Sequence, residues 1–355
     1  MTATGSPAHR PPPSGAGPAC TDWSRSQQLD PVGTAGSYRG FLLVEQPLPW
    51  PGDISEVPEL VEVAALVGAA GLRLQAVVAP GAEVIPGGAR RVIAYLPSPA
   101  AAGTGAWTAP LARAELLVPP DELPGCLDGM LPAIHGPGVA SAPTSSPGAP
   151  RGAPEPVVDL LVCTHGRRDA CCGSRGTDLA TELAATPGAL GRGTVRLWRT
   201  SHTGGHRFAP TCIALPSATM WAWADIDLLD QVLRGLGPAG SDGADGSDGA
   251  DGAPAQGVLD RFRGSACVGP APHQALERAV LARWGWRLLG AMRRVEALGT
   301  NRYRLEVEGG PVWEAVVTPG RRVAQPDCRT DPATATKYST EWLVRDLDLV
   351  VTAPA

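Results

Sequence analysis

Two cysteines and two histidines constrain the fold of this chain more than any other feature of its sequence. Cys163 and Cys172 are separated by eight residues in the polar loop CTHGRRDACCG, and His202 and His206 are separated by three in SHTGGHRFAP. Each loop follows an apolar run that is typical of a strand. Two thiolates and two imidazoles from neighbouring strand-end loops can hold a zinc ion, or a [2Fe–2S] cluster with two Cys on one iron and two His on the other.

The spacing within each pair separates these two possibilities. Structural zinc sites usually have two to four residues between cysteines and three to five between histidines. The histidine pair fits that rule, but eight residues between the cysteines form a longer loop, which suits a two-iron cluster better than a single ion. A CxxC motif, which is typical of thioredoxin-type dithiol enzymes, does not occur in the sequence. The spacing therefore favours the cluster.

The loop CTHGRRDACCG, followed by HTGGH and FAPT, resembles the sucrase/ferredoxin-like family, a branch of the thioredoxin-like [2Fe–2S] ferredoxins. The resemblance is specific over about Val157–Gly235, and looser in GSYRGFLLVEQPLPWP and in the C-terminal part. It implies a thioredoxin-like fold and a [2Fe–2S] cofactor. The word "sucrase" has no support here, because no paired carboxylates lie in a recognisable glycosidase context, and we predict no catalytic residue.

The resemblance also implies which residues bind the cluster. Carried over position by position, the ligands are Cys163, the cysteine before the glycine of CCG, His202 and His206. We expect Cys172 to be the second cysteine ligand, because it directly precedes that glycine as in the family pattern. Cys171 is the alternative to Cys172.

Composition restricts the compartment and the partners. Gly 44 and Pro 37 make up more than a fifth of the 355 residues, and they gather in stretches that we expect to be linkers. A net charge of -5 and a pI near 5.7 argue against nucleic-acid binding. No apolar run is long enough to span a membrane and the N-terminus lacks a signal-peptide core, so we expect a cytoplasmic protein without a membrane partner.

We predict an α/β chain in six parts. These are a disordered N-terminus (1–25), an N-terminal thioredoxin-like unit without a cluster (26–134), a linker (135–156), a thioredoxin-like [2Fe–2S] domain (157–235), a low-complexity flexible loop (236–257) and a small C-terminal α+β part (258–355). In both thioredoxin-like units the apolar pattern predicts the order βαβ and then ββα. Both metal-binding loops then follow parallel strands, at the end where open α/β sheets bind ligands.

Arginines surround the predicted ligands in an otherwise acidic protein. Six lie between Cys163 and His206, namely Arg167, Arg168, Arg175, Arg192, Arg196 and Arg199. Their positive charges would stabilise a reduced cluster or attract an acidic redox partner. The sequence does not identify that partner. We therefore expect an electron-transfer or redox-sensing protein rather than a substrate-specific enzyme. The alternatives are a thiol oxidoreductase with a regulatory cluster and a zinc-stabilised interaction module.

Overall fold

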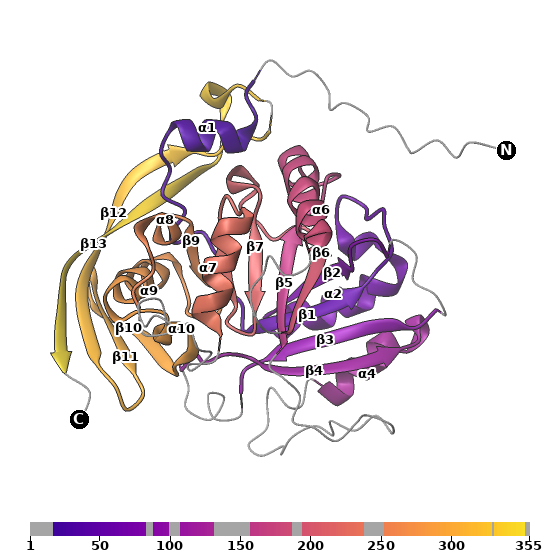
Figure 1. The fold of residues 1–355 in the computed structure, drawn as a ribbon, viewed down its shortest axis with the longest axis horizontal. Coiled ribbons are helices and arrows are strands. Elements are labelled where there is room, and N and C mark those ends of the chain that lie inside the picture. Colours follow the sequence, from indigo (N-terminus) through magenta and orange to yellow (C-terminus); the bar gives the residue numbers. More distant parts are fainter. Residues whose placement is uncertain are drawn as a thin grey trace.

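A computed structural model describes residues 17–82, 88–98, 107–130, 157–186, 194–237, 252–328 and 330–351. The predicted linker 135–156 lies outside the described residues, as does most of the predicted loop 236–257. The described residues form a mixed α/β structure with one large mixed sheet and a second, antiparallel sheet (Figure 1).

In the described part of the chain the large sheet has nine strands, in the order β4-β3-β1-β2-β6-β5-β7-β8-β9. Their bounds are β1 Gly40–Glu45, β2 Leu72–Val78, β3 Arg90–Leu96, β4 Ala112–Val118, β5 Val157–Cys163, β6 Thr194–Thr200, β7 Cys212–Leu215, β8 Thr219–Trp221 and β9 Phe262–Ser265. The second sheet has the order β10-β11-β12-β13, with bounds β10 Arg293–Gly299, β11 Arg302–Val307, β12 Val312–Ala324 and β13 Tyr338–Val351.

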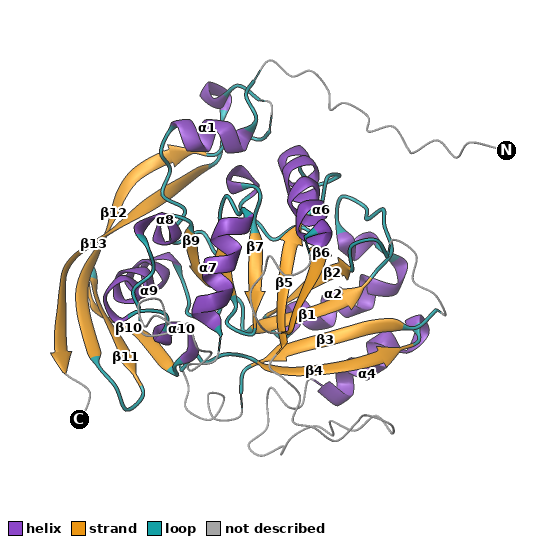
Figure 2. Ribbon diagram, viewed as in Figure 1, coloured by secondary structure: helices purple, strands orange, loops and turns teal. Residues whose placement is uncertain are grey.

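Apart from α1, the α-helices lie along the faces of the large sheet or between the two sheets (Figure 2). Their bounds are α1 Cys20–Ser26, α2 Val61–Ala69, α4 Leu123–Met130, α6 Thr177–Ala185, α7 Ile226–Leu236, α8 Gln256–Leu259, α9 Ala271–Trp284 and α10 Arg287–Gly290. Among the described residues, no helix combines the length and the apolar character needed to cross a membrane.

The two halves of the large sheet repeat one strand order. The first half runs β2-β1-β3-β4 and the second runs β6-β5-β7-β8, with the same parallel and antiparallel pairings at equivalent places. The halves join through their equivalent second strands, because β2 and β6 pair antiparallel at Val77–Thr200 and Val78–Arg199. Strands from both predicted units therefore belong to one continuous sheet.

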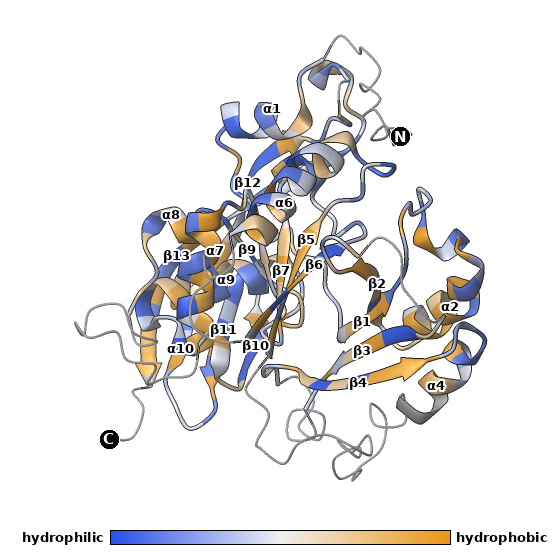
Figure 3. Cartoon of the chain, turned by 45° about the vertical axis from the view of Figure 1, so that its right-hand side comes forward, coloured by the Kyte–Doolittle hydropathy of each residue, from blue (hydrophilic) through white to orange (hydrophobic). Residues whose placement is uncertain are grey.

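An apolar core also connects the two halves. Leu43 and Ile93 of the first half belong to the same buried cluster as Leu161 and Ile213 of the second. Separate clusters lie beneath α2 and α4 and beneath α6, α7 and α9. Central strands such as β5 and β7 are largely hydrophobic along their length (Figure 3), as expected for strands that are covered on both faces.

A buried ion network lies where the two halves meet. The side chain of Asp159, on β5, is fully buried. Its Oδ1 accepts hydrogen bonds from Arg196 Nε at 2.7 Å and from Trp198 Nε1 at 2.7 Å, while its Oδ2 accepts from Arg196 Nη2 at 2.8 Å. Oδ2 also accepts from the hydroxyl of Tyr95 and from Arg113 Nε, both in the first half. One carboxylate thus holds groups from both halves together.

Helix α1 corrects the prediction for the N-terminus. Residues Cys20–Ser26 were expected to lie almost entirely within a disordered segment, but they form a helix with Cys20, Thr21 and Ser24 buried. The Thr21 hydroxyl donates to the carbonyl of Ala209 at 2.7 Å. Figures 1 and 2 place α1 beside the ends of β12 and β13. Composition alone missed this helix because distant parts of the chain bury it.

Candidate metal centre

The strand β5 and the helical turn that precedes α6 position the two predicted cysteine ligands. Cys163 is the last residue of β5, and Cys172 begins the π-helical turn Cys172–Gly176, which continues into α6. Asp169 Oδ1 accepts the backbone N–H groups of Cys171 at 2.9 Å and Cys172 at 3.2 Å. This side chain satisfies N–H groups at the start of the turn and so fixes the placement of both cysteines.

Glycines allow the loop between these cysteines to close on itself. A Cβ atom on Gly173 would lie 2.3 Å from the Cα of Gly166, and one on Gly176 would lie 1.9 Å from the carbonyl oxygen of Cys163. Both distances are shorter than any real contact of a Cβ atom. Both positions of CCGSRG therefore need glycine, because the backbone of another part of the loop lies where a side chain would be.

His202 follows β6 and is held through its backbone. Its N–H donates to Nδ1 of His165 at 3.2 Å, so Nε2 of His165 carries a proton and donates to the carbonyl of Pro51 at 2.6 Å. Burial lowers the pKa of His165, which favours this neutral form. Arg73 Nη2 donates to the His202 carbonyl at 2.6 Å. Since Pro51 and Arg73 belong to the first half of the sheet, that half supports the ligand loops of the second.

Three of the four predicted ligands come together. One ligand atom each from Cys163, Cys172 and His202 lie within 4.8 Å of one another, and both thiols are completely buried. Hydrogen bonds from Cys172 and His202 hold the pKa of Cys163 well below its usual value, while donation to that sulfur raises the pKa of Cys172. Nδ1 of His202 is buried and has no hydrogen-bond partner among the described residues. Two buried thiols with an imidazole beside them are a typical donor set of a metal site.

The structure does not group the fourth predicted ligand, His206, with these three. Its Nδ1 lies 3.0 Å from Asp169 Oδ2 and 3.3 Å from the sulfur of Cys20. The centroid of its ring is 6.3 Å from that of His202. His206 thus lies between the group formed by Cys163, Cys172 and His202, which we name the first site, and a second group of potential ligands.

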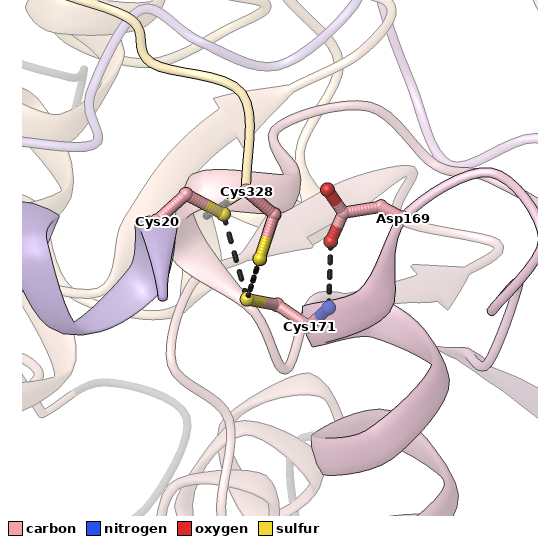
Figure 4. A group of neighbouring side chains, drawn as sticks. All are labelled: Cys20, Asp169, Cys171 and Cys328. Carbon is pink, nitrogen blue, oxygen red and sulfur yellow. Dashed lines mark hydrogen bonds between the residues drawn. The ribbon is translucent and has the colours of Figure 1, made fainter. Parts of the chain in front are cut away.

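The second group consists of Cys20 on α1, Asp169, Cys171 and Cys328 (Figure 4), and one ligand atom from each lies within 4.8 Å of the others. We name it the second site. Cys171, predicted as the alternative to Cys172, directs its sulfur to this site instead. The sequence gives no signal for the second site, because Cys20 and Cys328 are 151 and 157 residues from Cys171. No local spacing connects them.

Each site has a buried arginine beside it. Burial lowers the pKa of both Arg207 and Arg263 to about 10. Cys163 and Cys172 act in the opposite direction on Arg263, as Cys20 does on Arg207. Neither guanidinium has a carboxylate partner within the part of the chain that the structure describes. Two unpaired buried cations favour negative charge at the neighbouring sulfurs.

The predicted basic surroundings are only partly observed. Arg167 and Arg168 are exposed on the first loop, but Arg196 instead belongs to the Asp159 network. Arg192 lies outside the described residues. Arg263, which contacts the second ligand loop by donating to the carbonyl of Gly204 at 3.1 Å, was not predicted, because it lies 57 residues beyond His206.

Comparison with known proteins gives one result for the central part of the chain. A family model described as sucrase/ferredoxin-like matches residues 31–234, which is more than half of the 355 residues. The matched range includes Cys163, Cys172, His202 and His206, but neither Cys20 nor Cys328. No curated protein and no solved structure gives a significant match.

Proposed function

Because this chain belongs to the sucrase/ferredoxin-like family, we propose that its first site binds one [2Fe–2S] cluster and that the protein acts in electron transfer or redox sensing. The observation that carries this proposal is the grouping of the buried sulfurs of Cys163 and Cys172 with the imidazole of His202, with one ligand atom of each within 4.8 Å of the others. When bound, such a cluster supplies one-electron oxidation and reduction. The chain's own residues hold it and exclude water from its ligands.

In this proposal Cys163 and Cys172 are the thiolate ligands and His202 and His206 are the imidazole ligands. Asp169 contacts Nδ1 of His206, which leaves Nε2 as the nitrogen available to a metal. A carboxylate that accepts from the second nitrogen of a ligating histidine is a common support of metal sites, because it fixes the tautomer and the orientation of the ring. Three clustered ligands and a fourth further away suit a two-iron cluster better than a single ion.

We also propose that each half of the large sheet is a thioredoxin-like unit. The support is the repeated strand order, in which a parallel βαβ pair is extended by two antiparallel strands. The first half has no cysteine or histidine at the end of β1. Instead, Trp50 and Pro51 contact His165 of the ligand loop.

The proposed partner is an acidic redox protein in the cytoplasm. The exposed Arg167 and Arg168 lie on the loop that carries the cysteine ligands, and opposite charges favour docking at such a surface. A reducing compartment is supported by the cysteines, since all eight lie in the described residues and none forms a disulfide. We propose no nucleic-acid or membrane partner.

The test is metal analysis of the full chain purified without oxygen. We expect about two irons and two acid-labile sulfides per chain, a red-brown colour, and an electron paramagnetic resonance signal after reduction. A colourless protein without iron after expression with ample iron would overturn the proposed cluster. A protein that binds zinc at the first site would support the interaction-module alternative.

The buried charge of Arg263 is expected to set the potential of the first site. Reduction adds a negative charge, which a neighbouring cation stabilises. Arg263→Gln should therefore lower the midpoint potential, on the order of 60 mV, which for one electron is a tenfold change in equilibrium. Arg263→Lys, which keeps the charge, should stay close to the wild type. Redox titration with iron analysis tests this; equal midpoints for Gln and Lys would contradict it.

A further inference from the structure

Three cysteines from distant parts of the chain converge at the second site (Figure 4). Cys20 comes from α1, Cys171 from the turn before α6, and Cys328 from the connection between β12 and β13. The sulfur of Cys171 is 3.5 Å from that of Cys20 and 3.0 Å from that of Cys328. Free thiols have little reason to gather in this way, because weak S–H hydrogen bonds return little free energy for ordering three segments.

The distances suit a single metal ion. Sulfurs bound to one tetrahedral zinc ion at about 2.3 Å are about 3.7 Å apart, whereas a disulfide bond is only about 2.0 Å long. The 3.5 Å separation between Cys20 and Cys171 lies close to the first value, and the 3.0 Å separation between Cys171 and Cys328 lies between the two values, somewhat nearer the first. Asp169 completes a set of four, and all four ligand atoms lie within 4.8 Å of one another. The first site, whose fourth ligand is displaced, lacks this compact arrangement.

The charges around the second site also fit a thiolate-bound metal. Three thiolates and a carboxylate exceed the charge of a divalent cation, so the filled site is anionic. Arg207 is 6% exposed, and its Nε has no hydrogen-bond partner among the described residues. A buried cation at this place compensates the negative charge that the metal site would carry.

We propose that the second site binds one Zn²⁺ ion through the thiolates of Cys20, Cys171 and Cys328 and the carboxylate of Asp169. Zinc is the ion that takes four-coordinate, sulfur-rich, closed sites with a structural role. The ion would fasten α1 and the β12–β13 connection onto the turn that carries Cys172. Two of its four proposed ligands, Cys20 and Cys328, lie outside the range of the family match.

Asp169 connects the two sites. It contacts His206 through Oδ2 and holds the N–H groups of Cys171 and Cys172 through Oδ1. The zinc ion would therefore fix the carboxylate that orients a proposed cluster ligand. Cys20 also contacts this histidine, through its sulfur at 3.3 Å from Nδ1. The role of the ion at the first site is therefore to position His206.

The test is zinc and iron analysis of the full chain, expressed with both metals supplied. The wild type should contain about one zinc per chain in addition to any iron. Cys20→Ser and Cys328→Ser should lose most of the zinc and keep most of the iron. Cys126→Ser is the matched control and should keep both metals, because among the described residues this half-buried thiol donates only to the carbonyl of Leu123. Circular dichroism checks that each variant is folded. Of the three cysteines of the second site, Cys328 should tolerate serine best, because it is only half-buried.

Cys163→Ser separates this proposal from the proposed cluster, because it should lose iron and keep zinc. Growth with cobalt in place of zinc should give thiolate-to-cobalt absorption that Cys328→Ser lacks. A wild type without zinc, or with zinc that persists in both Cys20→Ser and Cys328→Ser, would overturn the proposal. So would a Cys171–Cys328 disulfide in mass spectrometry, or iron in place of zinc at the second site.

Discussion

Serine at Cys163 or at Cys172 is expected to abolish the visible absorption of the purified protein, whereas serine at Cys171 should leave it almost unchanged. Cys163 and Cys172 group with His202, and a serine hydroxyl is a poor replacement for a thiolate bound to iron. The sulfur of Cys171 points to the second site, so its loss should remove zinc instead. Absorption spectra and iron content of the three variants measure the difference.

The adjacent pair makes this comparison specific, because Cys171→Ser and Cys172→Ser change the same atom at neighbouring positions. Both thiols are buried, with Cys171 3% and Cys172 0% exposed, so general damage to the fold should be similar. If Cys171→Ser bleaches the protein and Cys172→Ser does not, the ligand assignment is wrong by one residue. If both variants lost the visible absorption equally, cluster binding at the first site would depend on an intact second site.

Asp159→Asn is expected to lower the free energy of unfolding by about 3–5 kcal/mol, the usual cost of removing one member of a buried ion pair. The carboxylate accepts hydrogen bonds from Arg196, Trp198 and Tyr95, and every group that faces it is a donor. An asparagine NH2 group would face donors on one side and leave Arg196 without its partner. Urea denaturation of the folded protein measures the loss.

This stabilisation should depend on pH. Burial alone would raise the pKa of Asp159, but hydrogen bonds from Arg196, Tyr95 and Trp198 outweigh it and hold the pKa below the usual value. A carboxylate with a lowered pKa stabilises the fold above its unfolded pKa of about 4 and ceases to do so as the pH falls through the folded value. The difference in stability between wild type and Asp159→Asn should therefore shrink as the pH falls below about 4.

A surface ion pair provides the control for this prediction. Asp230 pairs with Arg234 one helical turn away, and the arginine side chain is 66% exposed. Asp230→Asn should cost no more than about 0.5 kcal/mol, because exposed pairs on a helix contribute little. If Asp159→Asn cost no more than Asp230→Asn, the two halves of the sheet would not depend on the buried network.

Local sequence patterns predicted the elements of the large sheet closely. The predicted order βαβ and then ββα is observed in both halves, as β1-α2-β2-β3-β4-α4 and β5-α6-β6-β7-β8-α7, because each element is a regular apolar pattern between clear breaks. The loop between Cys163 and Cys172 was identifiable because its glycines and ligands lie within a short stretch. These features depend on residues that are near one another in the chain.

Features that depend on distant residues were not predicted. The pairing of β2 with β6, which joins the two halves, is a contact between strand edges that no local pattern encodes. Helix α1 and the second site depend in the same way on contacts across most of the chain. Arg196 was expected near the cluster, but side chains alternate along β6 and this one faces Asp159.

The placement of Cys171 and Cys172 on one helical turn has an evolutionary consequence. An insertion or deletion of one residue after Cys163 would rotate the turn by roughly a quarter of a circle and misdirect both thiols at once. Related chains that have both sites should therefore keep the loop at a constant length. By contrast, the cysteines equivalent to Cys20, Cys171 and Cys328 should be gained or lost together in such lineages, because no two of them form a complete site.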